Sequence, residues 1–112
     1  MEVTVEGQRS GAAIVRLAGR LDLLSAAAVR QRLMATVAEG HSRLVVDLAD
    51  VEFMDSTGLG CLVSGLKAAR LAGGDLRLAR PPEQARTILQ LTTLDRVLRP
   101  YDTAEEALAG YR

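Results

Sequence analysis

The stretch LVVDLADVEFMDSTGLG, residues 44–60, decides the fold. Its first part, residues 44–48, is a short and nearly continuous apolar run. Such a run predicts a central strand covered on both faces, as occurs in parallel sheets whose connections are helices. Residues 51–54 complete this unit, and a helix is expected to begin at Ser56 or Thr57.

A hairpin of two strands is expected on the N-terminal side. Val3 and Val5 alternate with polar residues, which is the period of a half-buried strand. A second alternating run covers residues 13–17, after a turn over residues 7–11. Residues 19–22 are expected to end this second strand.

Helices and strands are expected to alternate along the rest of the chain. Ser25 can cap a helix that Gly40 stops. After the central strand, the expected elements are a helix from Ser56 or Thr57 to Gly73-Gly74, a strand at 76–79, a helix after Pro82, a short strand at Val97-Leu98 and a helix from Thr103 through Leu108. The order ββαβαβαβα predicts an α/β protein with a mixed sheet of four to five strands and about four helices, in a single domain over residues 1–112.

The composition limits the classes of function. Apolar residues make up 48% of the 112-residue chain, which is enough for a core. Aromatic residues make up only 3% and Trp is absent, so platforms on which bases could stack are missing. The formal net charge is zero, which leaves no basic excess for a phosphate backbone or an anionic membrane. We therefore expect no direct binding of nucleic acid or membranes.

The single cysteine, Cys61, excludes an internal disulfide and a metal site built on several thiolates. Its apolar helical surroundings predict a buried and unreactive thiol. The first residues do not show the basic-then-apolar pattern of a signal peptide, and no apolar run reaches the ~18 residues that a membrane span needs, so neither feature is expected. A soluble, cytoplasmic protein without metal or cofactor is expected.

The segment Asp55-Ser56-Thr57-Gly58 has two explanations from its residues alone. Hydroxyl groups at a helix start can cap the helix by accepting bonds from free N–H groups, an effect of ~1 kcal/mol. A helix built only for stability would avoid Gly58 and Gly60, because each glycine costs ~1 kcal/mol against alanine. Small residues would also leave the backbone bare for another protein, and a helix start tolerates an added phosphate.

The run Val51-Glu52-Phe53-Met54-Asp55-Ser56-Thr57-Gly58-Leu59-Gly60 resembles the signature of anti-sigma factor antagonists of the STAS domain family. The resemblance extends over nearly the full chain. Gly19-Arg20-Leu21-Asp22 is similar to the family's turn before its first helix, and residues 44–48 are similar to its central strand. Residues 73–76, the stretch after Pro82 and residues 91–94 also sit at the family's spacings.

The resemblance implies a partner-switching cycle in bacterial transcription regulation, of the kind used in stress response and sporulation. Ser56 stands where an anti-sigma factor that is an ATP-dependent serine kinase adds phosphate, and Thr57 is the next-best acceptor. The unphosphorylated antagonist binds the anti-sigma factor and frees the sigma factor. The phosphorylated antagonist dissociates until a metal-dependent serine phosphatase restores it. The chain is thus expected to be acted upon, with no catalytic residue of its own.

The resemblance also implies a contact surface for the partner. Its expected members are Asp22, Asp55, Ser56, Thr57, Gly58, Leu59 and Gly60. Asp22 and Asp55 could equally be present because they form turns, and Thr57 could equally be present because it caps the helix. Leu23, Leu24 and Leu59 could be exposed contacts or ordinary core.

Other classes of function find less support. The only histidine, His41, is expected to be a solvated turn residue, and Ser56 is not in a Gly-x-Ser-x-Gly elbow. A dinucleotide loop is excluded because Val63 stands where its third glycine would be. The alternative is a STAS module that is not phosphorylated and acts as a scaffold or as a subunit of a transport complex. A monomer is expected for the free protein, because it must exchange partners.

Overall fold

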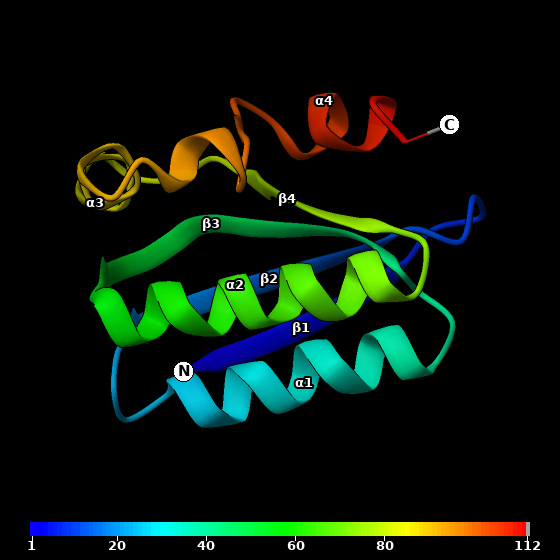
Figure 1. Cartoon of the computed structure of the whole chain (residues 1–112), viewed down its shortest axis with the longest axis horizontal. Coiled ribbons are helices and arrows are strands. Elements are labelled where there is room, and N and C mark those ends of the chain that lie inside the picture. Colours follow the sequence, from blue (N-terminus) through cyan, green and yellow to red (C-terminus); the bar gives the residue numbers. More distant parts are fainter. Residues whose placement is uncertain (112) are drawn as a thin grey trace.

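Within residues 1–111, which the computed structural model describes, the chain forms a five-stranded sheet and four α-helices (Figure 1). In chain order the elements are β1 (Glu2–Gly7), β2 (Ala13–Leu21), α1 (Ala26–Ala38), β3 (Arg43–Met54), α2 (Ser56–Leu71), β4 (Asp75–Ala79), α3 (Glu83–Leu91), the 3₁₀ helix η1 (Leu94–Arg96), β5 (Pro100–Tyr101) and α4 (Ala104–Ala109). The sheet order is β1-β2-β3-β4-β5. Strand β1 is antiparallel to β2, and the other neighbours are parallel. The predicted α/β class with a mixed sheet is confirmed.

Strand β3 lies at the centre of the sheet, as its apolar run predicts. Leu44 is paired with Ala13 of β2 on one side and with Leu76 of β4 on the other. Successive residues then face opposite sides of the sheet. Val46 belongs to the main core, whereas Val45 belongs to a second and smaller apolar cluster. Both faces of β3 are therefore buried, and this explains why its sequence does not alternate.

Helices α1 and α2 lie side by side over one face of the sheet (Figure 1). Val29 and Leu33 of α1 are one helical turn apart, as are Leu62 and Leu66 of α2, and all four are buried. Complete burial of side chains of this size stabilises a fold by about 1.5–3 kcal/mol each. This layer holds the main core and fixes the N-terminal end of α2 beside the loop that precedes α1.

The opposite face of the sheet is covered in part by the short helix α4. Ala104 and Ala107 pack against Ile14 of β2, Val45 of β3 and Ala79 of β4. Thr103 caps this helix as predicted, since its Oγ1 accepts a hydrogen bond from the backbone N–H of Glu106 at 3.0 Å.

An ion pair between Asp47 and Arg80 lies on the same face of the sheet as α4. The carboxylate of Asp47 is only 2% exposed, and Arg80 binds both of its oxygens, at 3.1 and 2.6 Å. Arg16 lies 3.6 Å from one of them. The backbone of Arg80 has φ 51°, in the left-handed region that is unfavourable for residues other than glycine. The bidentate contact holds the end of β4 in this conformation.

The last strand is not where the sequence predicts it. Val97 and Leu98 lie in a turn, because the N–H of Leu98 donates to the carbonyl of Leu94 at 2.7 Å and continues η1. The side chain of Leu98 is fully buried, and the strand β5 follows at Pro100–Tyr101. An apolar pair that fills the core from a turn has the same local pattern as a short strand, so the prediction of a strand at 97–98 was wrong.

Strand β2 is longer than predicted, because it continues to Leu21 through the segment that was expected to end it. Strand β3 runs without a break to Met54, so the unit predicted over residues 44–48 and 51–54 is a single strand. The cause is their mutual pairing: two register irregularities keep β2 and β3 paired as far as Leu21 and Met54. Only residues 43–47 of β3 pair with β4, so the end of β3 extends beyond that neighbour.

Two local expectations also need correction. Ser25 stands directly before α1, but its hydroxyl donates to the carbonyl of Arg20 at 2.6 Å and caps no helical N–H. His41 is half-buried, with its Nδ1 3.0 Å from the carbonyl oxygen of Gly11, so it joins two loops and is not a solvated turn residue. Gly40, at φ 103°, does follow the end of α1 as predicted. None of the described helices is both long and apolar enough to cross a membrane.

Candidate functional site

The candidate site is the turn from β3 into α2. Asp55 is the N-cap of α2, and its Oδ1 accepts a hydrogen bond from the N–H of Gly58 at 2.8 Å. The capping explanation for Ser56 and Thr57 was therefore wrong, because the preceding aspartate takes that role. The helix begins at Ser56, which is one of the two start positions that the sequence predicts.

Asp55 also joins this turn to the loop before α1. Its Oδ2 accepts a hydrogen bond from the N–H of Leu23 at 3.2 Å, and its own N–H donates to the carbonyl of Leu21 at 3.2 Å. One side chain thus organises both segments, in agreement with the turn-forming role considered for it. The loop that contains Asp22 and the turn that contains Ser56 form one continuous surface.

The two glycines of the first helical turn have different roles. A Cβ atom on Gly58 would overlap the carbonyl oxygen and carbon of Leu21, so glycine is required for α2 to approach the end of β2. A Cβ atom on Gly60 would meet nothing within 4 Å. The expectation of a bare backbone open to a partner therefore holds for Gly60, which is exposed, and not for the buried Gly58.

Ser56 and Thr57 are both exposed at the first two positions of α2. Among residues 1–111, no hydrogen bond involves either side-chain hydroxyl. The positive end of the helix dipole and the backbone N–H groups of the first turn lie directly beside them. Neither hydroxyl therefore stabilises the described part of the fold through a hydrogen bond, and both are open to solvent.

The loop before α1 adds apolar groups to this surface. Leu23 is 71% exposed and Leu24 is 93% exposed, so both belong to the surface and not to the core. Asp22 is half-buried: its Oδ1 accepts from the N–H of Leu24 at 3.0 Å, and its Oδ2 lies 3.3 Å from Nε of Arg20. Leu59, in contrast, is 3% exposed and lies in the main core, which leaves it no side-chain surface for a partner.

A groove of about 320 Å³ separates the first turns of α1 and α2. Its lining includes Leu23, Arg30, Thr57, Gly60 and Cys61. Burial, with a smaller contribution from the charge of Asp55, raises the pKa of the Cys61 thiol to about 12. The thiol is therefore neutral near pH 7 and is not an activated nucleophile. Across the described residues, no group of three side chains could hold a metal ion.

Sequence reasoning missed Gln84, the second residue of α3. Its Nε2 donates to the carbonyl of Met54 at 2.7 Å, and its Oε1 accepts from the N–H of Met54 at 2.8 Å. Met54 directly precedes the capping Asp55, so α3 holds the turn from the side opposite to β2. No local pattern in the sequence signals a contact between residues 30 positions apart.

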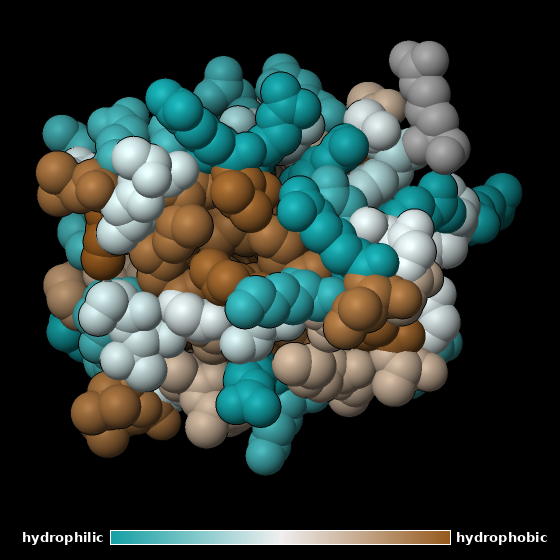
Figure 2. Space-filling model, in the orientation of Figure 1, coloured by the Kyte–Doolittle hydropathy of each residue, from teal (hydrophilic) through white to brown (hydrophobic). Residues whose placement is uncertain are grey.

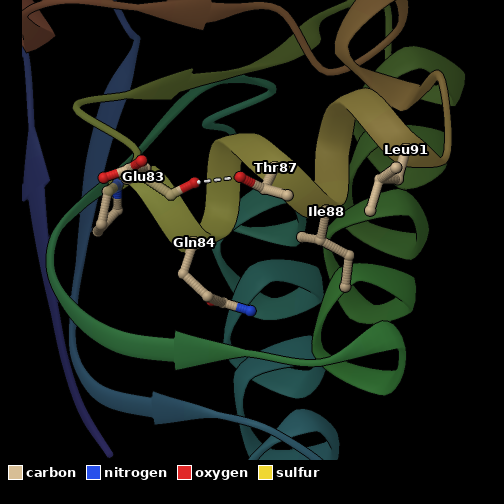
Figure 3. Close-up of a pocket in the computed structure, with 6 residues that line it drawn as sticks. Glu83, Gln84, Thr87, Ile88 and Leu91 are labelled. Atoms are coloured by element: carbon tan, nitrogen blue, oxygen red, sulfur yellow. Dashed lines mark hydrogen bonds between the residues drawn. The ribbon is translucent and has the colours of Figure 1, made fainter.

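A hollow of about 760 Å³ lies along α3, lined by Pro82, Glu83, Gln84, Thr87, Ile88 and Leu91. Figure 3 shows Gln84 pointing away from the axis of α3 toward the end of β3, whereas Ile88 and Leu91 extend along the hollow. In the space-filling view, hydrophobic surface gathers in a hollow between α2 and the segment of α3 and η1 (Figure 2).

Comparison with known proteins gives a consistent result. The STAS domain family model matches residues 4–107. The anti-sigma-F factor antagonist RsfB of Mycobacterium tuberculosis is 32% identical over 117 residues, which span 98% of this chain and 88% of RsfB. The crystal structure of an anti-sigma factor antagonist from Mycobacterium paratuberculosis has a TM-score of 0.85 and 32% identity, and the match covers 97% of this chain and 92% of that one.

Relatives from Thermotoga match over a shorter region. Those of Thermotoga neapolitana and Thermotoga maritima are 40% and 39% identical over 70 and 74 residues. The matched regions span 62% and 66% of this chain, and 62% and 66% of those proteins.

Proposed function

Because the chain belongs to the STAS domain family, we propose that it is an anti-sigma factor antagonist that is switched by phosphorylation of Ser56. One observation supports the choice of Ser56 as the acceptor. Its hydroxyl is exposed and makes no hydrogen bond among residues 1–111, and helix capping does not explain its presence because Asp55 caps α2. Thr57 is the second candidate acceptor. The proposal gives the chain no catalytic residue of its own.

The unphosphorylated form binds the anti-sigma factor through the surface around Ser56. Leu23 and Leu24 supply exposed apolar contacts, Gly60 allows a close approach to α2, and Asp22 and Thr57 supply polar groups. Protein interfaces combine an apolar centre with a polar rim, and this surface offers both kinds of group. Binding to the anti-sigma factor releases the sigma factor.

Phosphorylation breaks the complex through charge. The phosphate adds about −1.5 to −2 charges at the centre of the surface. In the free protein the helix start and solvent stabilise this charge. In the complex the phosphate would be buried next to the carboxylate of Asp55, so like-charge repulsion and desolvation oppose binding.

The proposed partners follow from this cycle. They are an anti-sigma factor that is an ATP-dependent serine kinase, which adds the phosphate, and a serine phosphatase, which removes it. The free chain would be a monomer that exchanges these partners, and the output would be transcription under stress or during sporulation.

Phosphate transfer to the purified chain tests the proposal. We would incubate it with ATP and each kinase-type anti-sigma factor of the source genome, and expect a mass increase of about 80 Da with the cognate one. Ser56→Ala should block the increase, and Thr57→Ala, a matched control, should not. Full incorporation into Ser56→Ala would refute the site. Tight binding without any incorporation into wild type would instead favour the scaffold or transport-complex alternative.

A further inference from the structure

Gln84 makes a bidentate contact with a single backbone residue. Its side-chain amide pairs with both the N–H and the carbonyl of Met54, at 2.8 and 2.7 Å. Strand β3 extends beyond β4 at this point, so none of the strands within residues 1–111 lies beside Met54 on that side. The amide of Gln84 therefore takes the place that the backbone of a neighbouring strand would occupy.

The contact lies immediately before the phosphoacceptor turn. From Met54 the chain passes to Asp55, whose N–H is held by Leu21 and whose carboxylate caps α2, and then to Ser56. The turn is thus held from β2 on one side and from α3 on the other. Among residues 1–111 the Ser56 hydroxyl makes no hydrogen bond that would fix it, so the backbone of the turn sets where that oxygen lies.

Phosphoryl transfer depends strongly on such positioning. The attacking oxygen, the phosphorus and the leaving oxygen must lie roughly in line, and the protein contributes mainly by placing them. A displacement of about 1 Å at a reacting atom can reduce a rate by ~100-fold. Binding of the partner, in contrast, is spread over many side chains and is less sensitive to a small shift of one turn.

We propose that Gln84 is a positioning residue for phosphate transfer to Ser56. This rests on the proposed function and deepens it: α3, which sequence reasoning did not connect with the site, holds the acceptor turn in the geometry that the kinase requires. In the transfer, the Ser56 oxygen forms a bond to the γ-phosphorus of ATP, the bond to the leaving ADP oxygen breaks, and the hydroxyl proton passes to a base of the kinase. Gln84 touches none of these atoms.

Two variants of Gln84 and a matched control test the proposal. Gln84→Met keeps the length of the side chain and removes both hydrogen bonds. Gln84→Glu keeps an acceptor for the N–H of Met54 but places a carboxylate oxygen against its carbonyl. Gln90→Met makes the same change on the same helix, at an exposed amide for which no hydrogen bond is found among residues 1–111. Each is assayed with ATP and the anti-sigma factor kinase that phosphorylates the wild type.

The expected result is a separation of kcat from KM. Both Gln84 variants should lower kcat for phosphorylation of Ser56 by about 10-fold or more, with KM within about 3-fold of wild type. Gln90→Met should match wild type in both. The Gln84 variants should stay folded, with a loss of at most about 10 °C in Tm, and the Met54 amide should exchange with solvent faster in Gln84→Met.

Several outcomes would overturn the proposal. An unchanged kcat in both Gln84 variants, while Met54 exchange is faster, would show that the contact exists but does not serve the reaction. A rise in KM alone would make Gln84 a binding residue. Unchanged exchange at Met54 would show that the contact is absent in solution. No incorporation into wild type with any kinase would instead refute the proposed function, and the role of Gln84 with it.

Discussion

Asp55 accepts a hydrogen bond from the backbone N–H of Leu23 at 3.2 Å, and thereby joins two loops that lie 32 residues apart in the chain. Its other carboxylate oxygen caps α2 through Gly58 at 2.8 Å. A single side chain therefore determines where the exposed leucines of one loop and the hydroxyls of the next helix lie relative to each other. The predictions below begin from this arrangement.

Asp55→Ala should destabilise the protein by about 1–2 kcal/mol, because it removes the cap of α2 and the acceptor for Leu23. Asp55→Asn should lose less than Asp55→Ala, because its amide oxygen can still cap α2, whereas its amide nitrogen cannot accept the hydrogen bond from the N–H of Leu23. Urea unfolding of both variants measures the difference. Equal losses in the two variants would show that the cap of α2 contributes nothing measurable to the stability of the protein.

Alanine at the two glycines of α2 should have opposite effects. Gly58→Ala places a Cβ against the backbone of Leu21 and should destabilise the fold by about 1–3 kcal/mol. Gly60→Ala meets open space and should stabilise α2 by up to about 1 kcal/mol, the difference in helix propensity. Thermal unfolding of the two variants measures both effects, and each variant serves as the control for the other. A loss at Gly60 equal to that at Gly58 would contradict the assigned contacts.

Ser56→Asp should weaken binding of the anti-sigma factor by about 10-fold or more, which corresponds to about 1.4 kcal/mol. The cause is a charge placed in the proposed interface beside Asp55. Titration calorimetry with the purified partner measures this change. Thr4→Asp adds the same charge at an exposed residue of β1 and should leave the affinity unchanged. Equal losses in both variants would point to an effect of net charge alone.

Arg80→Ala should lower the midpoint of unfolding, because it leaves the carboxylate of Asp47 buried without its bidentate partner. Asp47→Asn in the same variant should recover part of the loss, since a neutral amide is easier to bury than a charge. A double-mutant cycle in urea measures the coupling between the two residues. Additive effects would show that the ion pair contributes nothing to stability.

Cys61 should resist thiol reagents in the folded protein at pH 8, because burial raises the pKa of its thiol to about 12. The unfolded thiol ionises near its ordinary value of 9.0. The unfolded state therefore releases its proton first, and the stability that the raised pKa confers is lost as the pH rises from about 9 toward 12. Labelling at pH 8 with and without urea, and unfolding between pH 8 and 10, check this. Cys61→Ala should reduce the loss of stability over this pH range.

The central strand of the fold can be predicted from a short stretch of the sequence alone. The apolar run at residues 44–48 predicts a buried parallel strand because a short run that is apolar at nearly every position suits a strand covered on both faces. The position of the last strand could not be predicted in this way. Leu98 packs into the core from a turn, and two adjacent apolar residues are found in the sequence whether the buried segment is a turn or a strand.

At the site, the residues of interest were identified, but some of their roles were not. Asp55, Ser56 and Thr57 are all residue types that can cap a helix, and only the three-dimensional structure distinguishes which one does so. The need for glycine at position 58 depends on the path of β2, which the local sequence does not specify. Gln84 was missed because its contact with Met54 joins a side chain to a backbone across 30 residues and leaves no periodic pattern.

The hydrogen bond between Asp55 and Leu23 also bears on the thermodynamics of partner exchange. Both segments are already ordered before a partner arrives, so association needs to remove little conformational entropy from the backbone of this surface. The free and bound forms would then share one shape, and the anti-sigma factor would select between two charge states of a rigid surface and not between two folds. Such a switch can be reset by a phosphatase without any refolding of the chain.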